Sequence, residues 1–372
     1  MNSKIERGTV VTIAAPAHHN ALDHESMTRR TIAATLADLK GFEFGGEFDP
    51  THRYPLPLYF VPGTTLVGLD RAASLGIHGE DDLFGGVVAF GTMATKSITH
   101  PLIDSARVPE GWSADFPASV AGHVLDGYTA FDRADARRAG RRVLEKGPLR
   151  VKRSRGIGGN GQWVVQDAQA METCLAGIDT AEIESSGVVL EENLEEVTTY
   201  SVGQVRVGGM QVTYWGTQRL TRNNHGAEVY GGSDLSTIRG NFDTLAEAAD
   251  NPEVKLAIAG ARAYDAAAGE CFGGFFASRR NYDVAAGTDA RGLRRVGVLE
   301  QSWRIGGASG AEMAVLAMFR RDRGLLSARA STVEVYGAEF TPPSRAIVLF
   351  HGVDPQIGPL TKYVVSAPHV HA

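Results

Sequence analysis

A glycine-rich stretch between two short strand-like segments constrains the fold more than any other feature of this sequence. Residues 149–152 and 162–166 read as strands, and the stretch between them includes Gly156, Gly158 and Gly161. This spacing matches the Gly-x-Gly-x-x-Gly pattern of dinucleotide-binding loops, which requires a strand before the glycines and a helix after them. Because a strand follows here, the pattern predicts an antiparallel hairpin whose glycine loop forms a flap.

Such a flap could close over phosphate groups with its backbone N–H groups. Lys152 ends the first strand and would place an ammonium group against the same phosphates. The alternative is a glycine-rich hairpin with a solvated basic rim, because short glycine motifs also occur by chance. The hairpin residues alone leave both interpretations open.

Acidic residues follow other strand-like segments. Glu191 and Glu192 come directly after the apolar run Val188 to Leu190. A carboxylate or backbone group at a strand end beside a cleft can pair with an adenine amino group. The alternative is a solvated acidic loop, since acidic side chains are mostly exposed.

Asp283 and Glu300 lie near the ends of two strand-like segments that we expect to be antiparallel neighbours. Two carboxylates at one rim suit Mg²⁺, which proteins bind through one or two carboxylates together with substrate phosphates. Arg304 would then lie near a transferred phosphoryl group, where its fixed fork of donors stabilises developing charge. Each acid taken alone is better explained as a capping or ion-pair residue at a strand end.

The chain is long enough for two or three domains, since 372 residues exceed what one core usually organises. Strand-like segments at 9–14, 58–61 and 87–90 alternate with a helix expected over 23–39. Residues 1–95 are therefore predicted to form a parallel α/β domain with helices on both faces.

Two α+β subdomains are expected to follow, residues 96–192 with the flap and residues 193–330 with the carboxylates. Within the second we expect a hairpin around Gly208-Gly209 and a helical stretch over roughly 245–268. Residues 331–372 contain further strand-like pieces, and the sequence leaves their packing open.

Composition argues against several classes of protein. A net charge of −6 gives no support for a nucleic-acid-binding face. The two cysteines, Cys174 and Cys271, cannot form a disulfide framework and fit a reducing compartment. No stretch approaches the roughly 18–20 apolar residues that a membrane span needs, and residues 1–10 lack the apolar core of a secretory signal. We therefore expect a soluble, cytoplasmic protein.

The order of these segments resembles the ATP-grasp superfamily over about residues 90–325. There, a nucleotide-facing lysine and a glycine flap precede a hinge that meets adenine, and a Glu-x-Asn-x-Arg motif that holds metal and phosphate comes last. The whole chain also resembles an uncharacterised bacterial family of that superfamily. The resemblance implies a mixed fold class, α/β and α+β: an N-terminal parallel α/β domain followed by a two-subdomain ATP-grasp fold.

The resemblance also implies site residues. Lys96 and Lys152 would contact ATP phosphates, and Lys152 and Arg304 would be the catalytic residues. Glu191 or Glu192 would meet adenine or ribose. The flap glycines would be Gly156, Gly158, Gly159 and Gly161, and the Mg²⁺ ligands would be Asp283, Glu300 and Ser302.

This sequence departs from the family pattern at two places. Ser302 replaces the usual asparagine of the last motif, and a serine is a shorter and weaker metal ligand. Thr198 and Thr199 stand where an acidic residue often meets the ribose.

The implied activity is that of a ligase with the cofactors ATP and Mg²⁺, which activates a small-molecule carboxylate as an acyl phosphate for attack by an amine or thiol. The alternatives are a small-molecule phosphotransferase of the same fold and a non-catalytic nucleotide-binding regulator. Asn223, Asn224, His225 and the loop 226–232 could line the acceptor side, although an ordinary surface loop explains them almost as well. The expected partners are small molecules rather than nucleic acid or membrane, and a homodimer stays open.

Overall fold

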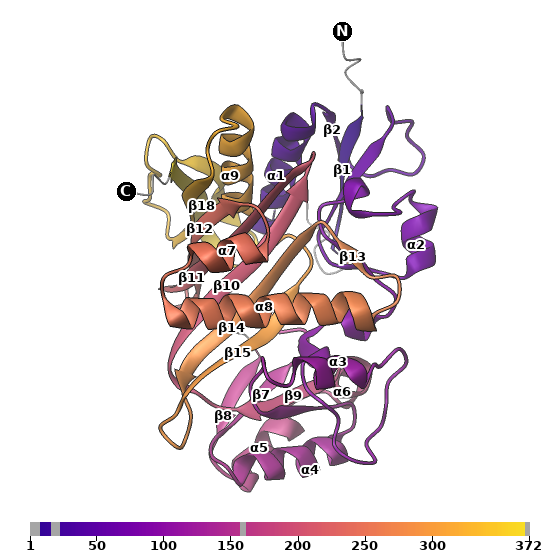
Figure 1. Cartoon of the computed structure of the whole chain (residues 1–372), viewed down its shortest axis with the longest axis vertical. Coiled ribbons are helices and arrows are strands. Elements are labelled where there is room, and N and C mark those ends of the chain that lie inside the picture. The colour runs from indigo at the N-terminus through magenta and orange to yellow at the C-terminus, as the bar shows by residue number, and fades with distance from the viewer. Residues whose placement is uncertain (1–7, 16–22, 157–160, 369–372) are drawn as a thin grey trace.

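The computed structural model describes residues 8–15, 23–156 and 161–368. Figure 1 shows the described chain as a large sheet in the middle, an N-terminal α/β part at its upper right and a smaller sheet-and-helix part below it. In the described residues the strands form one eight-stranded, one four-stranded and two three-stranded sheets. This mixture of parallel and antiparallel sheets confirms the predicted fold class.

The N-terminal sheet is parallel, as predicted, with the strand order β2-β1-β3. Its elements are β1 (Thr9–Ile13), α1 (His24–Lys40), β2 (Glu43–Glu47) and β3 (Leu58–Pro62). Helix α1 begins where Asp23 accepts a hydrogen bond from the Ser26 amide, and it ends at Gly41, whose φ of 71° suits glycine. This helix packs its apolar side on the sheet through Ile32 and Leu36.

The segment at 87–90 does not join this sheet, so that prediction is wrong. Strand β5 (Gly86–Val88) instead pairs with β4 (Leu66–Val67) and β13 (Phe276–Ala277) in a separate three-stranded sheet. The Gly86 amide also donates to the Trp303 carbonyl at 2.8 Å. Strand β13 and Trp303 are both more than 180 residues away along the chain, and local periodicity carries no information about such pairing. Helix α2 (Leu69–Ser74) and the 3₁₀ turn η1 (Glu80–Asp82) connect β4 to β5.

The four-stranded sheet is antiparallel, in the order β6-β9-β7-β8, and we refer to it with its helices as the lid. Its core joins alternate strand residues such as Leu149, Val151 and Leu190 to Ala139 and Met171 of the covering helices. The elements are β6 (Gly127–Ala130), α4 (Arg133–Leu144), β7 (Leu149–Arg153), β8 (Gln162–Val165), α5 (Ala168–Ala176), α6 (Thr180–Ser186) and β9 (Val188–Glu192). The predicted hairpin is confirmed, since β7 pairs antiparallel with β8.

The eight-stranded sheet is antiparallel in the order β15-β14-β10-β11-β12-β16-β18-β17. Its strands are β10 (Glu195–Val207), β11 (Met210–Arg222), β12 (Glu228–Arg239), β14 (Arg279–Thr288), β15 (Arg294–Ser302), β16 (Ser327–Tyr336), β17 (Ile347–Asp354) and β18 (Gly358–Pro368). The predicted hairpin at Gly208 and Gly209 is confirmed, and their φ angles of 57° and 76° are those a tight turn requires. The last three strands extend the same sheet. Residues 331–368 therefore pack on the large sheet, a point that the sequence left open.

Helices cover the two faces of this sheet differently. Helix α8 (Pro252–Cys271) runs across one face, and α9 (Ser309–Arg321) lies near α1 at the upper end of the other (Figure 1). The helical stretch predicted over roughly 245–268 is present as two helices, because α7 (Phe242–Ala248) ends before α8 begins. Pro252 has no N–H to continue a helix, and Asn251 caps the new one by accepting hydrogen bonds from the next amides.

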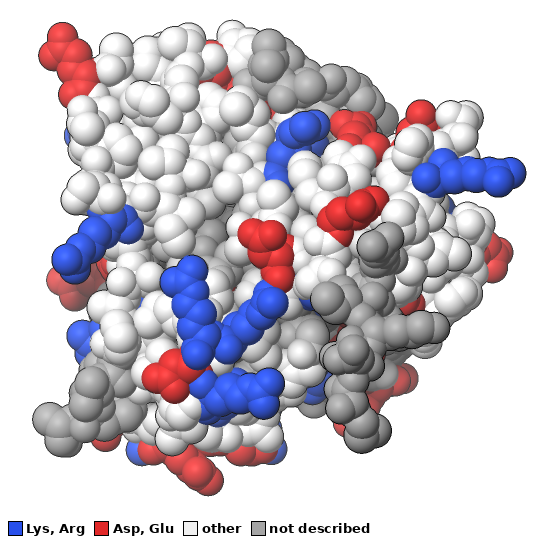
Figure 2. Space-filling view, turned by 90° about the horizontal axis from the view of Figure 1, so that it is seen from above, with Lys and Arg blue, Asp and Glu red and all other residues white. Residues whose placement is uncertain are grey.

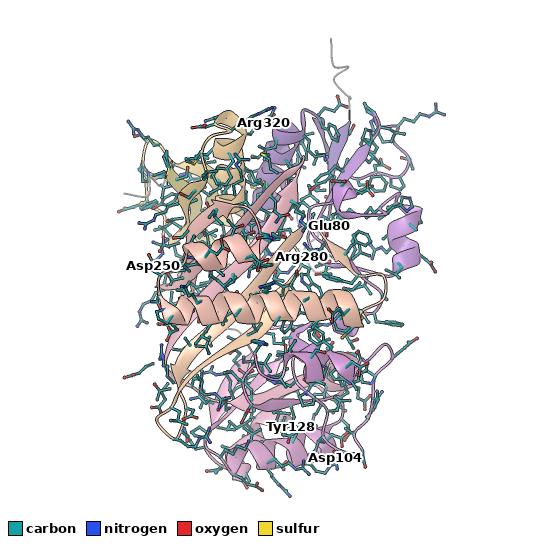
Figure 3. All side chains as sticks on the ribbon, in the orientation of Figure 1. Glu80, Asp104, Tyr128, Asp250, Arg280 and Arg320 are labelled. Carbon is teal, nitrogen blue, oxygen red and sulfur yellow. The ribbon has the colours of Figure 1, made fainter. Side chains whose placement is uncertain are left out.

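A charge network joins the N-terminal part to the large sheet. Arg280 of β14 pairs with Glu80 of η1 at 2.5 Å and with Asp265 of α8 at 3.1 Å. Figure 3 labels Glu80 and Arg280, which lie close together above α8. Because Arg280 is largely buried, this network fixes the two parts more firmly than an exposed ion pair would.

The surface seen in Figure 2 mixes blue and red side chains over the same face instead of separating them into one basic area. That mixture fits the modest net charge of −6. None of the helices in the described part of the chain has the length and apolar content that a membrane span requires.

Two glycine substitutions, one in the large sheet and one in the helix that covers it, test the space around the backbone. A Cβ on Gly216 of β11 would lie 2.2 Å from the Asp234 carbonyl oxygen, so we expect Gly216→Ala to lower the free energy of unfolding by about 1–3 kcal/mol. A Cβ on Gly269 of α8 meets nothing within 4 Å, and Gly269→Ala should raise stability by about 0.5–1 kcal/mol. Urea unfolding midpoints of both variants check this; two shifts of the same sign would contradict it.

Candidate nucleotide and metal site

One face of the lid sheet is turned away from its helices. Since successive strand residues point to opposite faces, Arg150, Lys152, Gln162 and Glu191 share the face opposite to Leu149 and Val151. This inner face faces β14 and β15 of the large sheet, because Lys96, at its rim, contacts both the lid and β15. The region between the two sheets therefore collects the polar side chains that the sequence singled out.

Lys152 and Glu191 form a buried ion pair on the inner face. The Lys152 ammonium contacts Glu191 Oε1, and both side chains are almost completely buried. The second carboxylate oxygen of Glu191 lies 3.1 Å from His100 Nε2, and His100 is fully buried too. Burial alone would raise the pKa of Glu191, but the Lys152 charge and the His100 hydrogen bond outweigh it and hold that pKa at about 2. Burial lowers the pKa of Lys152, and the Glu191 charge opposes this.

Lys96 connects the lid to the large sheet. It lies in the 3₁₀ turn η3 (Lys96–Ile98), and its Nζ is 2.8 Å from Glu300 Oε2 and donates to the Gly156 carbonyl at 3.0 Å. Gln301 of β15 holds the preceding turn η2 (Gly91–Ala94) by donating to the Met93 and Thr95 carbonyls at 2.9 and 2.8 Å. The start of the flap and the end of β15 therefore meet at one ammonium group.

Asp283 and Glu300 lie directly opposite each other on β14 and β15. The predicted strand pairing is therefore confirmed, and the two carboxylates project from the same face of the sheet. Burial and the neighbouring Glu300 charge raise the pKa of Asp283 to about 6. Asp283 Oδ1 accepts hydrogen bonds from Gln218 Nε2 at 2.8 Å and Asn281 Nδ2 at 3.0 Å, which leaves Oδ2 available to a cation.

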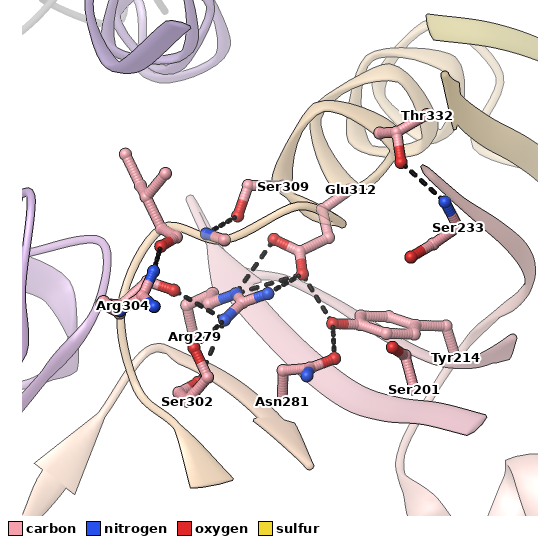
Figure 4. Close-up of polar contacts among 12 residues, drawn as sticks. Ser201, Tyr214, Ser233, Arg279, Asn281, Ser302, Arg304, Ser309, Glu312 and Thr332 are labelled. Carbon is pink, nitrogen blue, oxygen red and sulfur yellow. Dashed lines mark hydrogen bonds and ion pairs between the residues drawn. The ribbon is translucent and has the colours of Figure 1, made fainter. Parts of the chain in front are cut away.

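Arg279 of β14 clamps the segment after β15 (Figure 4). Its guanidinium donates to the Ser302 carbonyl at 3.0 Å and the Arg304 carbonyl at 2.6 Å, and it pairs with Glu312 of α9 at 2.8 Å. Tyr214 of β11 adds a 2.6 Å hydrogen bond to the same Glu312 oxygen. Although burial opposes it, the Glu312 charge raises the pKa of Arg279 above its usual value. The clamp thus fixes the segment that carries Arg304.

Arg304 lies next to this clamp and is partly buried. Its Nη1 donates to the Ile305 carbonyl at 2.6 Å. Burial lowers its pKa, and the charges of Glu25, Glu300 and Asp283 oppose this. Arg304 is therefore near the carboxylates of β14 and β15 on one side and near the first turn of α1 on the other.

An apolar cluster lies where the lid meets the large sheet. Leu125, Leu194 and Ala285 are buried there, and Leu299 packs against them while partly exposed. Glu192, which follows Glu191, points to the opposite side of β9. It lines, with Asp126 and Arg291, a surface hollow of about 380 Å³ behind this junction.

The structure brings most of the sequence-predicted residues together, with some differences in their contacts. Ser302 Oγ accepts from Arg279 Nη1 at 3.2 Å, so its hydroxyl is engaged by a cation. Gly156 and Gly161 border the flap, and Gly158 and Gly159 lie outside the described residues. Asn224 donates to the Ile357 and Pro359 carbonyls, so the loop 223–227 packs on the C-terminal hairpin, and residues 228–232 belong to β12.

Sequence reasoning missed His100, Arg279, Glu312 and Gln218. Gln218 could have been found, because β11 pairs with β10 and β10 with β14, and alternation places it on the Asp283 face. His100, Arg279 and Glu312 follow no recognisable pattern, and only the tertiary contacts identify them.

The residues present fit Mg²⁺ with a nucleotide. Among the described residues, no cluster brings three or more His, Cys, Asp or Glu side chains together as metal ligands. Mg²⁺ does not need one, since it usually takes one or two carboxylates together with waters and substrate phosphates. Burial and the adjacent Glu300 charge raise the pKa of Asp283, and a divalent cation beside the two carboxylates would oppose this rise.

Three comparisons bear on the chain as a whole. A family model described as "Protein of unknown function (DUF3182)" matches residues 12–364. Among curated proteins, none matches. Among solved structures, the D-alanyl-alanine synthetase A of Vibrio cholerae aligns at 12% identity and a TM-score of 0.52, covering 85% of this chain and 94% of that one.

Two further solved structures cover almost all of this chain. The carboxyaminoimidazole ribonucleotide synthase of Aspergillus clavatus, complexed with ATP, aligns at 10% identity and a TM-score of 0.51, covering 98% of this chain and 95% of that one. The biotin carboxylase domain of the Hydrogenobacter thermophilus 2-oxoglutarate carboxylase was solved with MgADP, ADP and bicarbonate. It aligns at 12% identity and a TM-score of 0.50, covering 97% of this chain and 86% of that one. These structures have the ATP-grasp fold, and so does this chain.

Asp283→Asn tests the electrostatics of the acid pair. Because the folded protein raises the pKa of Asp283 from 3.8 to about 6, it binds this proton more tightly than the unfolded chain does. The Asp283 contribution to stability is therefore lost as pH rises from about 4 to about 6. We expect Asp283→Asn to be more stable than the wild type above pH 6 without divalent cations, and the difference to shrink towards pH 4. Urea unfolding across this range measures it, with exposed Asp250→Asn as control; a variant less stable throughout would contradict it.

Arg279→Met tests the clamp. The substitution leaves Glu312 buried without its cation, and we expect the free energy of unfolding to fall by about 3–5 kcal/mol. Arg279→Met/Glu312→Leu removes both charges and should recover much of the loss. A double-mutant cycle by chemical unfolding measures the coupling, and additive effects would show that the two side chains do not act as a pair.

Proposed function

We propose that this chain, which belongs to the family described as "Protein of unknown function (DUF3182)", is a Mg-ATP-dependent ligase that activates a small-molecule carboxylate for attack by an amine or thiol. The observation that carries the proposal is the meeting of Lys96, Lys152 and the Asp283–Glu300 pair between the lid and the large sheet. Cations for phosphates and carboxylates for a metal are the two sets of groups that Mg-ATP requires.

The ATP-grasp fold of the chain supports the proposal at the level of reaction class. The solved relatives include a D-alanyl-alanine synthetase and a carboxyaminoimidazole ribonucleotide synthase bound to ATP. When bound, Mg-ATP would supply the γ-phosphoryl group that turns a carboxylate into an acyl phosphate, and the amine or thiol would then displace phosphate.

The residues of this chain have distinct roles in the proposal. Lys96 and Lys152 would exchange part of their present pairing for phosphate oxygens and so offset negative charge. The flap, bordered by Gly156 and Gly161, would exclude water from the acyl phosphate. Arg304, positioned by Arg279, would stabilise charge on the transferred phosphoryl group.

Glu191 and Ser302 have other roles here than a nucleotide contact and a metal contact. Glu191 opposes the effect of burial on the pKa of Lys152, because the carboxylate favours the charged form of that lysine. Ser302 contributes its hydroxyl to the Arg279 clamp. Asp283 and Glu300 alone would then hold Mg²⁺, and the apolar cluster with Leu299 would contact adenine.

A non-catalytic nucleotide-binding role is the second candidate, and the engagement of Ser302 with Arg279 favours it, because that contact reduces the ligands available for a second metal ion. The two candidates differ in products. A ligase forms ADP, phosphate and an amide or thioester when given its substrates, whereas a regulator binds nucleotide without turnover.

Calorimetric titration with a non-hydrolysable ATP analogue, with and without Mg²⁺, tests nucleotide binding. We expect Mg²⁺-dependent binding in the wild type, and Lys152→Met should weaken it about 10- to 100-fold through the loss of charge-assisted hydrogen bonds. Lys96→Met is measured beside it, because Lys152→Met leaves the buried Glu191 without its lysine partner. Glu300→Gln should abolish the Mg²⁺ dependence, and exposed Lys146→Met is the matched control.

Absence of binding to folded wild-type protein would overturn the proposal. If binding is found, a panel of carboxylates and amines is screened for ADP release. Phosphate transfer without an amide or thioester product would identify a phosphotransferase instead of a ligase.

A further inference from the structure

Arg29 is a buried arginine without an ion-pair partner. Its residue is only 4% exposed, although it carries a full positive charge. Nη2 donates to Ser26 Oγ at 3.2 Å, and the buried Nε has no hydrogen-bond partner. Within residues 8–15, 23–156 and 161–368, no carboxylate lies at ion-pair distance from this guanidinium. The equally buried Arg279, in contrast, is paired with Glu312.

The environment of Arg29 confirms that its charge is poorly compensated. Burial lowers the pKa of its guanidinium, and the charges of Glu47, Asp23 and Glu25 only partly oppose this. An uncompensated buried charge is costly, and folded proteins normally pair it or bind a counter-ion. An anion bound beside Arg29 would therefore lower the free energy of the folded protein.

Arg29 lies at the carboxyl end of the N-terminal parallel sheet. A Cβ on Gly63 would lie 2.6 Å from Arg29 Nη1 and 3.0 Å from the Ala15 amide nitrogen, so the guanidinium lies between the segments that follow β3 and β1. In the order β2-β1-β3 the chain proceeds to one side of β1 and then to the other, which makes β1/β3 the topological switch point. Open parallel sheets bind ligands in the crevice at the carboxyl ends of the strands at such a point.

This edge of the N-terminal sheet also adjoins the Arg304 segment of the candidate nucleotide site. A Cβ on Gly85 would lie 3.9 Å from Arg304 Cα and 4.0 Å from Pro62 Cδ, so the end of β3 packs beside the Arg304 segment. The Trp303 carbonyl holds the same junction by accepting hydrogen bonds from Gly86 N and Thr65 Oγ1. The carboxyl end of β3, beside Arg29, and the segment that carries Arg304 are therefore neighbours in the fold.

We infer that Arg29 binds an oxyanion of the acceptor substrate, a carboxylate or phosphate group other than the one that reacts. The planar guanidinium fork matches either group, and a buried site strengthens the interaction. The N-terminus of α1 adds its positive dipole end at the same edge of the sheet. The substrate class is thus a small molecule with at least two functional groups, one of them a permanent anion. The identity of the ligand as a substrate rests on the proposed function, whereas anion binding at Arg29 does not.

Thermal unfolding of the full chain with succinate or inorganic phosphate, at an ionic strength balanced with chloride, tests the inference. The variants are Arg29→Met and, as matched control on the exposed side of the same helix, Arg30→Met. We expect succinate or phosphate to raise the unfolding midpoint of the wild type and of Arg30→Met, and to leave Arg29→Met unmoved, because only a ligand that binds the folded state stabilises it. A response to succinate identifies a carboxylate group, and a response to phosphate a phosphorylated one.

A second readout separates anion binding from a structural role. Without added anion, Arg29→Met should be at least as stable as the wild type, since it removes an uncompensated buried charge. A marked loss of stability, or equal anion responses in wild type and Arg29→Met, would overturn the inference. So would the absence of any response in the wild type.

The titration with the ATP analogue keeps the two proposals apart. If nucleotide binds to wild type and Arg29→Met alike while neither responds to anions, the Arg29 site fails and the nucleotide site stands. If anions stabilise the wild type through Arg29 but no nucleotide binds, the anion site stands and the ligase proposal fails.

Discussion

The pairing of buried charges around the junction of the lid, the large sheet and α9 is the constraint on which this structure depends. Lys152, Lys96 and Arg279 are all almost completely buried, and each is paired with a carboxylate from a different element. A buried charge that lost its partner would cost several kcal/mol. The Lys152–Glu191 pair therefore fixes β7 against β9 within the lid, Lys96 joins the flap border to β15, and Arg279–Glu312 joins β14 to α9. The same pairs keep cations ready where a polyphosphate would need them. Both the stability of the fold and the proposed chemistry therefore require these charged residues at these positions.

The antiparallel register of the large sheet brings residues that are distant in sequence together in one candidate site. Because Ser201, Asp283 and Glu300 are cross-strand neighbours on β10, β14 and β15, their side chains share one face. The opposite face packs on α8 through residues such as Tyr282, Val284 and Val298. A polar face and an apolar face thus alternate along the same strands, and the apolar face supplies the rigidity on which the polar one relies.

The sequence predicted features whose signal is local and missed those that depend on distant partners. The β7–β8 hairpin follows from glycines between two strands, and the facing of Asp283 and Glu300 follows from two strands joined by a short turn. The pairing of β5 with β13 brings together residues 86–88 and 276–277, and no local pattern encodes it. The break before α8 could have been read from Asn251-Pro252. His100 and the Arg279–Glu312 pair are defined only by packing, because nothing in their neighbours along the chain sets them apart.

Adjacent residues of β15 point to opposite faces of the sheet and have different roles. Glu300 faces the site, and Gln301 points to the α8 side, where it holds the turn that precedes Lys96. Inserting or deleting a single residue within this strand would exchange the two faces, so that the amide would enter the site and the carboxylate would enter the core. Length variation among related chains should therefore be absent from residues 294–302 and collect in the turn at 289–293. This strand can therefore tolerate substitutions at many positions, but not a shift of its register by one residue.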